Sequence, residues 1–167
     1  SKEIVVREAV NGETIKTLDG QDRELVEGDI IITDGKTPIA IAGVMGGENT
    51  EVTDETKTVL LESAMFDRLQ VRKTATRLGL RSEASARFEK GIDPQRVELA
   101  LNRAASLLAE LANGEVCQGI VADDRFELTA VDIEITAEKI NSVLGTNMST
   151  DEVASIWSRL QFTYDLN

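Results

Sequence analysis

Histidine is absent from this sequence of 167 residues, and cysteine occurs once, at Cys117. Without histidine, the chain lacks the commonest general base and the commonest metal ligand. A single cysteine cannot form an internal disulfide, and it cannot hold zinc without further ligands. Chemistry in this chain must therefore rest on carboxylates, hydroxyls and backbone amides, and we expect no metal site or resident cofactor.

Long apolar runs are missing as well. No run approaches the roughly 18 apolar residues of a membrane span. The first residues alternate between polar and apolar, whereas a signal peptide has a basic segment followed by an apolar one. We therefore expect neither a membrane partner nor a signal peptide, and the lack of disulfides favours the cytoplasm.

Positive charge is scarce, since 18 Lys and Arg residues face 30 Asp and Glu residues, for a net charge of −12. Such a balance argues against broad binding to DNA or RNA, because cationic side chains supply most of that affinity. Any RNA contact must therefore be local. The contents of 41% hydrophobic and 29% charged residues are typical of a soluble globular protein, and the length allows one or two domains.

Short β-branched runs separated by turn residues dominate the first part of the chain. We expect strands at residues 3–9, 13–18, 29–33 and 38–42. Asn11-Gly12 predicts a hairpin between the first two strands, and Asp19-Gly20 and Asp34-Gly35 predict further turns. The apolar run at residues 58–61 predicts a buried strand.

Two helices are expected next. Residues 67–78 have apolar side chains at helical spacing and are followed by Gly79, which suits a left-handed C-cap. Asp93-Pro94 opens a longer amphipathic helix that Asn113-Gly114 closes, and residues 115–121 predict another strand. The expected fold class is α+β, with an antiparallel or mixed sheet packed against the long helix.

An acidic, weakly patterned stretch predicts a domain boundary near Leu128. The expected domains are residues 1–128 and residues 129–167. The second begins with a predicted strand at residues 131–135. Two helices and a strand-like end then complete the pattern, which predicts an incomplete β-α-α-β unit of winged-helix type.

Capping residues mark the two helices of this second domain. Thr136 is the expected N-cap of the first helix. Ser149 and Glu152 have the spacing of a capping box at the start of the second helix.

Glu62 follows the apolar run at residues 58–61, and a carboxylate in such a place usually needs a polar partner. It could accept a hydrogen bond from a ligand hydroxyl, which would discriminate strongly against a ligand that lacks the hydroxyl. Alternatively, it lies at a strand end and faces water.

A glycine-rich stretch at residues 43–48 contains Gly46 and Gly47. Its backbone amides could bind an anion, or its lack of side chains could let a ligand approach closely. Alternatively, it is only a tight turn between strands. The spacing is neither that of a dinucleotide-binding loop nor that of a phosphate-binding loop with its lysine, so it gives little support to a nucleotide-binding enzyme.

Residues 67–90 form a basic island in the acidic chain. The candidate tRNA contacts in and beside its first helix are Arg68, Arg72, Lys73, Arg77 and Arg81. Pairs that are four residues apart form a cationic stripe on a helix, which suits phosphate contacts. Alternatively, these side chains pair with acidic residues elsewhere.

Residues 81–94 are rich in small side chains that leave room for a ligand. Ser82 and Ser85 could hydrogen-bond such a ligand, or they could be ordinary turn and capping groups. Because no histidine can activate either serine, a Ser-His-Asp hydrolase is not available.

Three segments carry a resemblance to a known family. They are residues 43–48, 59–66 and 77–94, with the sequences GVMGGE, VLLESAMF and RLGLRSEASARFEKGIDP. In this order and with these separations they resemble the editing domain of the β subunit of bacterial phenylalanyl-tRNA synthetase. The resemblance covers residues 2–125, and residues 129–167 resemble the start of the winged-helix-like domain that follows it.

The resemblance implies a cytoplasmic ligase, an α₂β₂ heterotetramer that charges tRNA-Phe with phenylalanine using ATP and Mg²⁺. The ATP and Mg²⁺ sites are expected outside these residues. The family's β subunit hydrolyses tyrosine wrongly attached to tRNA-Phe, because an apolar synthetic pocket rejects an added hydroxyl poorly. By resemblance, Glu62 reads the tyrosine hydroxyl, and Gly46, Gly47, Ser82 and Ala84 belong to the same editing pocket.

In this family, water attacks the ester, so no covalent nucleophile is expected. The family also places a histidine shortly before the first residue of this sequence, which contains none. We therefore expect tyrosine binding with impaired hydrolysis. The alternative is a non-catalytic subunit scaffold or RNA-docking module, in which replacing Glu62 would change stability and leave ligand selectivity unaltered.

Overall fold

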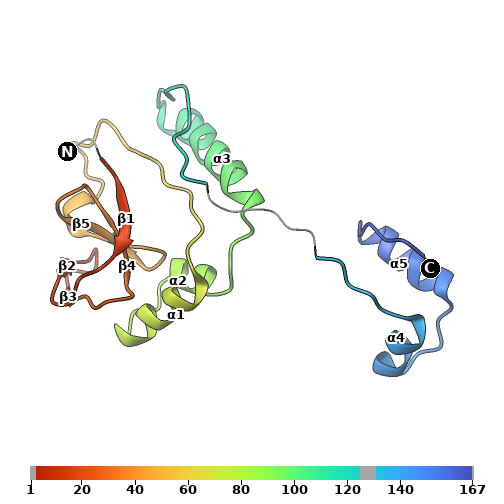
Figure 1. Ribbon diagram of the computed structural model, residues 1–167. Helices are drawn as coiled ribbons and strands as arrows, with labels where there is room; N and C mark the ends of the chain where they lie inside the picture. The colour runs from red at the N-terminus through yellow and green to blue at the C-terminus, as the bar shows by residue number, and fades with distance from the viewer. Residues whose placement is uncertain (1–2, 125–130, 167) are drawn as a thin grey trace. The chain divides into compact units, whose positions relative to one another are not determined.

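The computed structural model describes residues 3–124 and 131–166, which Figure 1 traces from one terminus to the other. The chain divides into two compact units, Ser1–Asp123 and Asp124–Asn167. The predicted boundary at Leu128 lies outside the described residues. Within the described residues, no helix is both long and apolar enough to cross a membrane.

The first unit contains two small antiparallel sheets (Figure 1). One has the strand order β1-β4-β5-β6, and the other pairs β2 with β3. The strands are β1 (Val5–Glu8), β2 (Thr14–Lys16), β3 (Asp22–Glu24), β4 (Ile30–Thr33), β5 (Pro38–Ile41) and β6 (Met45–Gly46). Three successive isoleucines begin β4, and such β-branched side chains favour extended backbone. The predicted strands at residues 29–33 and 38–42 are confirmed.

The predicted hairpin across Asn11-Gly12 is wrong in its pairing. The chain does turn there, with Gly12 at φ +82°, but β1 pairs with β4 and β2 pairs with β3. The Gly12 N–H donates to the Leu25 carbonyl, so this turn is bonded to the segment that follows β3. A turn sequence indicates where a chain reverses, whereas the burial of apolar faces decides which strands pair.

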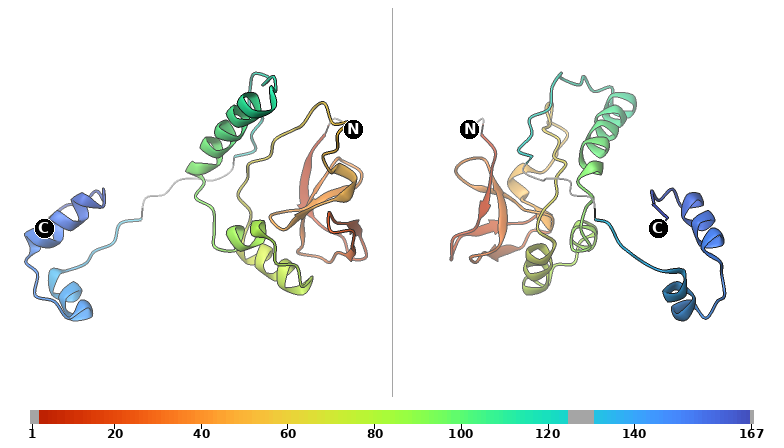
Figure 2. Two further views of the ribbon diagram at one scale, coloured as in Figure 1. Left: turned by 180° about the vertical axis from the view of Figure 1, so that it is seen from behind. Right: turned by 45° about the vertical axis from the view of Figure 1, so that its right-hand side comes forward.

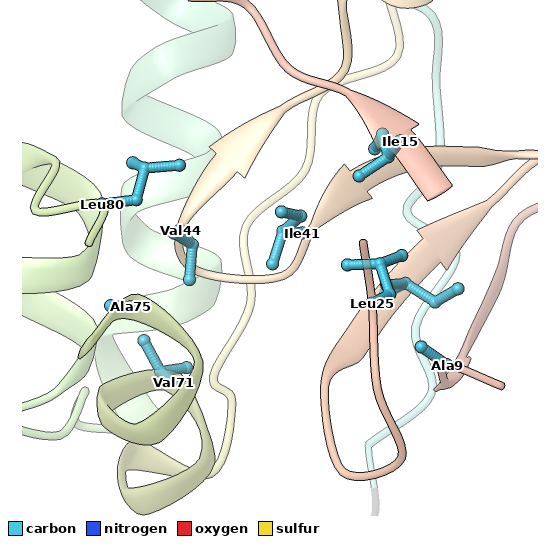
Figure 3. Packing of buried hydrophobic residues seen from close by; sticks show 9 residues of the cluster. Ala9, Ile15, Leu25, Ile41, Val44, Val71, Ala75 and Leu80 are labelled. Carbon is cyan, nitrogen blue, oxygen red and sulfur yellow. The ribbon is translucent and has the colours of Figure 1, made fainter. Parts of the chain in front are cut away.

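An apolar core joins the strands of this unit to residues 66–88. The sheet side contributes Leu25, Ile31, Ile41 and Val44, and the helical side contributes Val71, Ala75 and Leu80, as Figure 3 shows for all of these except Ile31. Each large aliphatic side chain buried in this way stabilises the fold by about 1.5–3 kcal/mol. Phe66 and Phe88 pack against the edge of this core with their ring centroids 5.4 Å apart.

Two short helices lie beside the sheet in both further views of Figure 2. The first is α1 (Arg68–Arg77), whose N-cap Asp67 accepts hydrogen bonds from the backbone of Leu69 and Gln70. Its predicted C-terminal glycine, Gly79, has φ +61°. The second is α2 (Glu83–Phe88), which was not predicted from the sequence because its six residues are too few for a periodic signal.

Asp29 attaches α1 to the sheet. This carboxylate is 3% exposed and accepts hydrogen bonds from the Thr74 hydroxyl at 2.7 Å and the Val26 N–H at 2.9 Å. It also forms an ion pair with Arg77, whose guanidinium donates to the Glu24 carbonyl as well. Every polar group in this contact therefore has a partner, as burial requires.

The long amphipathic helix is present as α3 (Gln95–Ala112) and ends where Asn113-Gly114 was predicted to close it, with Asn113 as a left-handed C-cap. None of its residues is buried, so the helical side of the core comes from α1 and α2. The Ser63 hydroxyl donates to the Val97 carbonyl of α3 at 2.7 Å. The α+β class is confirmed, and both sheets are antiparallel throughout the described residues.

The predicted strands at residues 58–61 and 115–121 are wrong. Residues 58–61 follow η1 (Glu48–Thr50) in an irregular stretch, and Leu60 is 81% exposed. An apolar run forms a strand only where a neighbouring strand takes up its backbone hydrogen bonds. No strand among the described residues pairs with either segment.

In the second unit the two predicted helices are confirmed as α4 (Ala137–Leu144) and α5 (Thr150–Arg159). Thr136 caps α4, and Ser149 and Glu152 form the predicted capping box of α5. Residues 131–135 and 162–164 are not strands, so the β parts of the predicted β-α-α-β unit are absent from the described residues.

Candidate ligand pocket between the glycine turn and α2

A depression of about 220 Å³ opens where the end of β5, the glycine turn and α2 meet. The turn contributes residues 43–46, α2 contributes Ala84 and Phe88, and the segment before α1 contributes Glu62. Three of the five predicted pocket residues, Gly46, Glu62 and Ala84, therefore line one hollow. They are separated by up to 38 positions in the sequence, and the tertiary fold brings them together.

The glycine turn, residues 43–46, follows β5, includes the short strand β6 and forms one wall of the pocket. Gly43 has φ +67°, a conformation that L side chains adopt at a cost. A Cβ at Gly43 would lie 3.1 Å from Phe88 Cγ and 3.1 Å from Val71 Cγ2. The lack of a side chain therefore allows α1 and α2 to pack directly on the turn.

Gly47 does not line the depression. It is buried, and its N–H donates to the Ile39 carbonyl at 2.7 Å. A Cβ at position 47 would lie 2.8 Å from the same carbonyl oxygen. Only glycine therefore allows the two backbone segments to approach so closely. Gly46, in contrast, lines the pocket while its carbonyl accepts a hydrogen bond from the Leu18 N–H at 3.0 Å.

Glu62 is the one ionisable residue among the described residues that line the depression. As a residue it is exposed, yet it lies in a hollow whose other lining residues are apolar or glycine. The partial burial removes water from the carboxyl group and raises the pKa of Glu62 above the usual 4.5. A carboxyl group in this place can accept a hydrogen bond from a hydroxyl that enters the pocket.

Ser82 is the N-cap of α2, and its hydroxyl is already engaged. It donates to the Val44 carbonyl at 2.5 Å and accepts from the Ser85 N–H at 3.0 Å. The Ser85 hydroxyl completes the capping box, and Ser85 is 1% exposed. Ser82 therefore lies next to the pocket without lining it, and its hydrogen bonds connect α2 to the glycine turn.

Phe88 lines the depression and was not singled out from the sequence. It lies one helical turn after Ala84, so both point to the same side of α2. The signal that could have found it is this spacing of four residues, which becomes visible once α2 is recognised as a helix. Met45 of the glycine turn lines the pocket as well.

The five predicted tRNA contacts fall into two groups. Arg77 forms the ion pair with Asp29, and Arg81 lies 3.7 Å from a carboxylate oxygen of Glu89. For Arg68, Arg72 and Lys73, no ion-pair partner exists among the described residues. All three are exposed on α1.

A second depression, of about 460 Å³, lies elsewhere in this unit, between β2, the start of β5 and η1. It is larger, but it contains none of the predicted pocket residues, and Lys16 and Glu48 in its wall form an ion pair with each other. The smaller depression is the better candidate for a ligand site. Its carboxyl group, that of Glu62, has no ion-pair partner among the described residues and lies among apolar side chains. Among the described residues, no cluster of three or more side chains could hold a metal ion.

Comparison with known proteins gives a consistent result. The family described as "B3/4 domain" matches residues 1–113. Similar curated proteins are the phenylalanine–tRNA ligase beta subunits of Geobacillus kaustophilus, at 54% identity over 98% of this chain, and of Staphylococcus haemolyticus, at 52% identity over 97%. The corresponding subunit of Bacillus subtilis is 52% identical over 98% of the chain. The chain spans about a fifth, 20%, of the length of each of these relatives.

Proposed function

Because the chain belongs to the B3/4 domain family and is homologous over nearly its whole length to bacterial phenylalanine–tRNA ligase beta subunits, we propose that it forms part of the editing site of such a ligase. The reaction is hydrolysis of the ester that joins tyrosine to tRNA-Phe. The observation that carries the proposal is the convergence of Glu62, Gly46 and Ala84 on one depression.

The pocket has the chemistry needed to select tyrosine over phenylalanine. Its apolar lining accepts the ring that both amino acids share, and Glu62 accepts a hydrogen bond from the phenolic hydroxyl that only tyrosine has. A volume of about 220 Å³ lies below the range of roughly 300–1,000 Å³ typical of larger ligands, so it favours a single side chain over a nucleotide.

Hydrolysis at this site proceeds by attack of water and needs no covalent nucleophile. The oxygen of water bonds to the ester carbonyl carbon, the bond from that carbon to the ribose oxygen breaks, and the ribose oxygen takes up the proton. Ser82 and Ser85 both have engaged hydroxyls, so neither is poised as a nucleophile. The role of this chain is to bind and orient the tyrosyl group.

The wider context of the proposal is the whole ligase. The homologous subunits are named for a phenylalanine–tRNA ligase, so we propose a cytoplasmic assembly with an α subunit and with tRNA-Phe as partners. ATP and Mg²⁺ serve the synthetic reaction of that assembly at sites outside this chain. Within this chain, the exposed cations Arg68, Arg72 and Lys73 of α1 are the groups that we propose contact the tRNA backbone.

Titration of the labelled chain with tyrosine and then with phenylalanine, followed by NMR, tests the pocket. We expect tyrosine-selective shifts at Gly46, Glu62 and Ala84, and we expect Glu62→Ala, which removes the acceptor oxygens, to abolish the selectivity. Glu55→Ala is the matched control, since Glu55 is exposed and outside the pocket. Equal responses to both amino acids, with Glu62→Ala altering only stability, would instead favour the non-catalytic scaffold.

Hydrolysis itself is measured on tyrosyl-tRNA-Phe with the ligase assembled from full-length subunits that contain this segment. We expect Glu62→Ala to slow tyrosine release and to leave the charging of tRNA with phenylalanine unchanged. The chain by itself, which has no histidine, should deacylate slowly. Rapid deacylation by the chain alone would contradict that expectation.

Salt dependence tests the tRNA contacts. Removal of one cation that binds a phosphate should lower the slope of log affinity against log salt by about 0.7–0.9. We therefore expect the double variant Arg72→Ala, Lys73→Ala to reduce the slope by roughly 1.4–1.8. An unchanged slope would place the tRNA on another surface.

A further inference from the structure

A hydrogen bond joins α2, which carries the pocket residues Ala84 and Phe88, to the glycine turn. It runs from the Ser82 hydroxyl to the carbonyl of Val44, at 2.5 Å. Val44 lies in the glycine turn, is 2% exposed and belongs to the apolar core, so its carbonyl has a fixed position. The contact joins segments 38 positions apart in the sequence.

The Ser82 hydroxyl has two roles at once. It accepts the Ser85 N–H, which caps α2, and it donates its proton to Val44, which positions the capped helix against the turn. The cap could be made by any short side chain with an acceptor oxygen, such as aspartate. The link to Val44 needs a donor as well, and among uncharged short side chains a hydroxyl provides both in one atom.

From this geometry we propose that Ser82 is a positioning residue for tyrosine selection, which holds Ala84 and Phe88 of α2 in place against the glycine turn in the pocket that Glu62 also lines. The inference rests on the proposed editing function. It departs from the expectation that Ser82 binds the ligand itself, because the hydroxyl is engaged and the residue does not line the depression.

Positioning by Ser82 predicts a loss of selectivity as well as of activity. Glu62 must meet the phenolic hydroxyl at hydrogen-bonding distance while Ala84 and Phe88 hold the ring, so a shift of α2 weakens that hydrogen bond in particular. A purely structural role would lower the amount of active enzyme for every substrate equally. The ratio of kcat/KM for tyrosyl-tRNA-Phe to that for phenylalanyl-tRNA-Phe separates the two.

The experiment compares three variants in the ligase assembled from full-length subunits. Ser82→Ala removes both hydrogen bonds, Ser82→Asp keeps the cap without the donor, and Ser82→Thr keeps both. We expect the tyrosine-over-phenylalanine ratio to fall by about two- to tenfold in the Ala and Asp variants, the equivalent of one hydrogen bond, and to be restored in Ser82→Thr. Ser106→Ala on α3, which removes an exposed hydroxyl bonded to the Asn102 carbonyl, should leave the ratio unchanged.

An unchanged ratio in Ser82→Asp would overturn the inference even if Ser82→Ala fails to assemble, because the aspartate retains the helix cap. Glu62→Ala, which removes the acceptor for the phenolic hydroxyl, shows whether the inference about Ser82 fails alone or together with the proposed function. If Glu62→Ala lowers the ratio and the Ser82 variants do not, the pocket edits and Ser82 does not position it. If the parent ligase shows no dependence on Glu62, the function and the inference built on it both fall.

Discussion

Replacement of Gly43 by alanine tests whether the glycine turn holds the two helices at their observed distance from the sheet. Gly43 has φ +67°, and alanine in this left-handed region costs about 1–2 kcal/mol. The added methyl would also lie 3.1 Å from Phe88 Cγ, 3.1 Å from Val71 Cγ2 and 3.3 Å from Phe66 Cδ2. Crowding of this kind in a packed core costs a further roughly 1–3 kcal/mol.

The expected destabilisation by Gly43→Ala is therefore about 2–5 kcal/mol, a large part of the roughly 5–15 kcal/mol that stabilises an ordinary domain. Gly20→Ala is the matched control. Gly20 has a similar φ of +75°, and nothing lies within 4 Å of the position of its Cβ, so this variant should show the conformational cost alone. Chemical denaturation followed by circular dichroism gives both free energies of unfolding.

The difference between the two variants measures the crowding between the turn and the helices. If Gly43→Ala costs no more than Gly20→Ala, the close approach of Phe88, Val71 and Phe66 to the turn is refuted. The same variant should weaken tyrosine binding, because Phe88 lines the pocket and must move to admit the methyl group.

Further predictions concern the buried carboxylate, the pocket carboxyl and the second unit. Asp29→Ala should destabilise the first unit by about 2–4 kcal/mol in the same denaturation assay, because the Thr74 hydroxyl is left buried without its acceptor and Arg77 loses its ion pair. A loss of stability no larger than that of the exposed control Asp54→Ala would contradict this prediction. The Glu62 carboxyl should titrate by NMR above 4.5 because of its burial, while Glu13 titrates below 4.5 because Arg7 donates to it; the reverse order would refute the assignment. Since the folded state holds the Glu62 proton more tightly than the unfolded chain, stability should fall as pH rises from 4.5 through the raised pKa, and Glu62→Gln should remove that fall. Ser149→Ala should lower the stability of α5 by about 1 kcal/mol, visible as reduced helical carbon shifts at residues 150–159, and unchanged shifts would show that the capping box is not needed.

Local features of the fold could be predicted because they depend on a few neighbouring residues. The caps of α4 and α5, the left-handed Gly79, the end of α3 at Asn113-Gly114 and the turn at Asp19-Gly20 follow from side-chain and backbone chemistry within one turn of the chain. The pairing of β1 with β4 could not be read in this way, because it depends on which apolar faces are buried together.

The candidate site, too, could be predicted from the sequence only in part. Glu62, Gly46 and Ala84 were identified from the sequence, and the structure brings them to one depression. Gly47 was grouped with them, although its lack of a side chain serves the close approach of the Ile39 carbonyl. Ser82 was expected either to bind the ligand or to be an ordinary capping group, and its hydroxyl caps α2 and is bonded to Val44.

The sequence by itself determined the class of fold, the ends of most helices, the family resemblance and the scarcity of groups for metal or triad chemistry. The resemblance rests on three sequence segments, and the other properties follow from composition and from interactions between residues close in the chain. Only the tertiary structure decided that α1 and α2 close the core and that residues 58–61 form no strand. It also decided that Phe88 and Glu62 line one pocket, because such contacts join distant segments and depend on the packing of the whole unit.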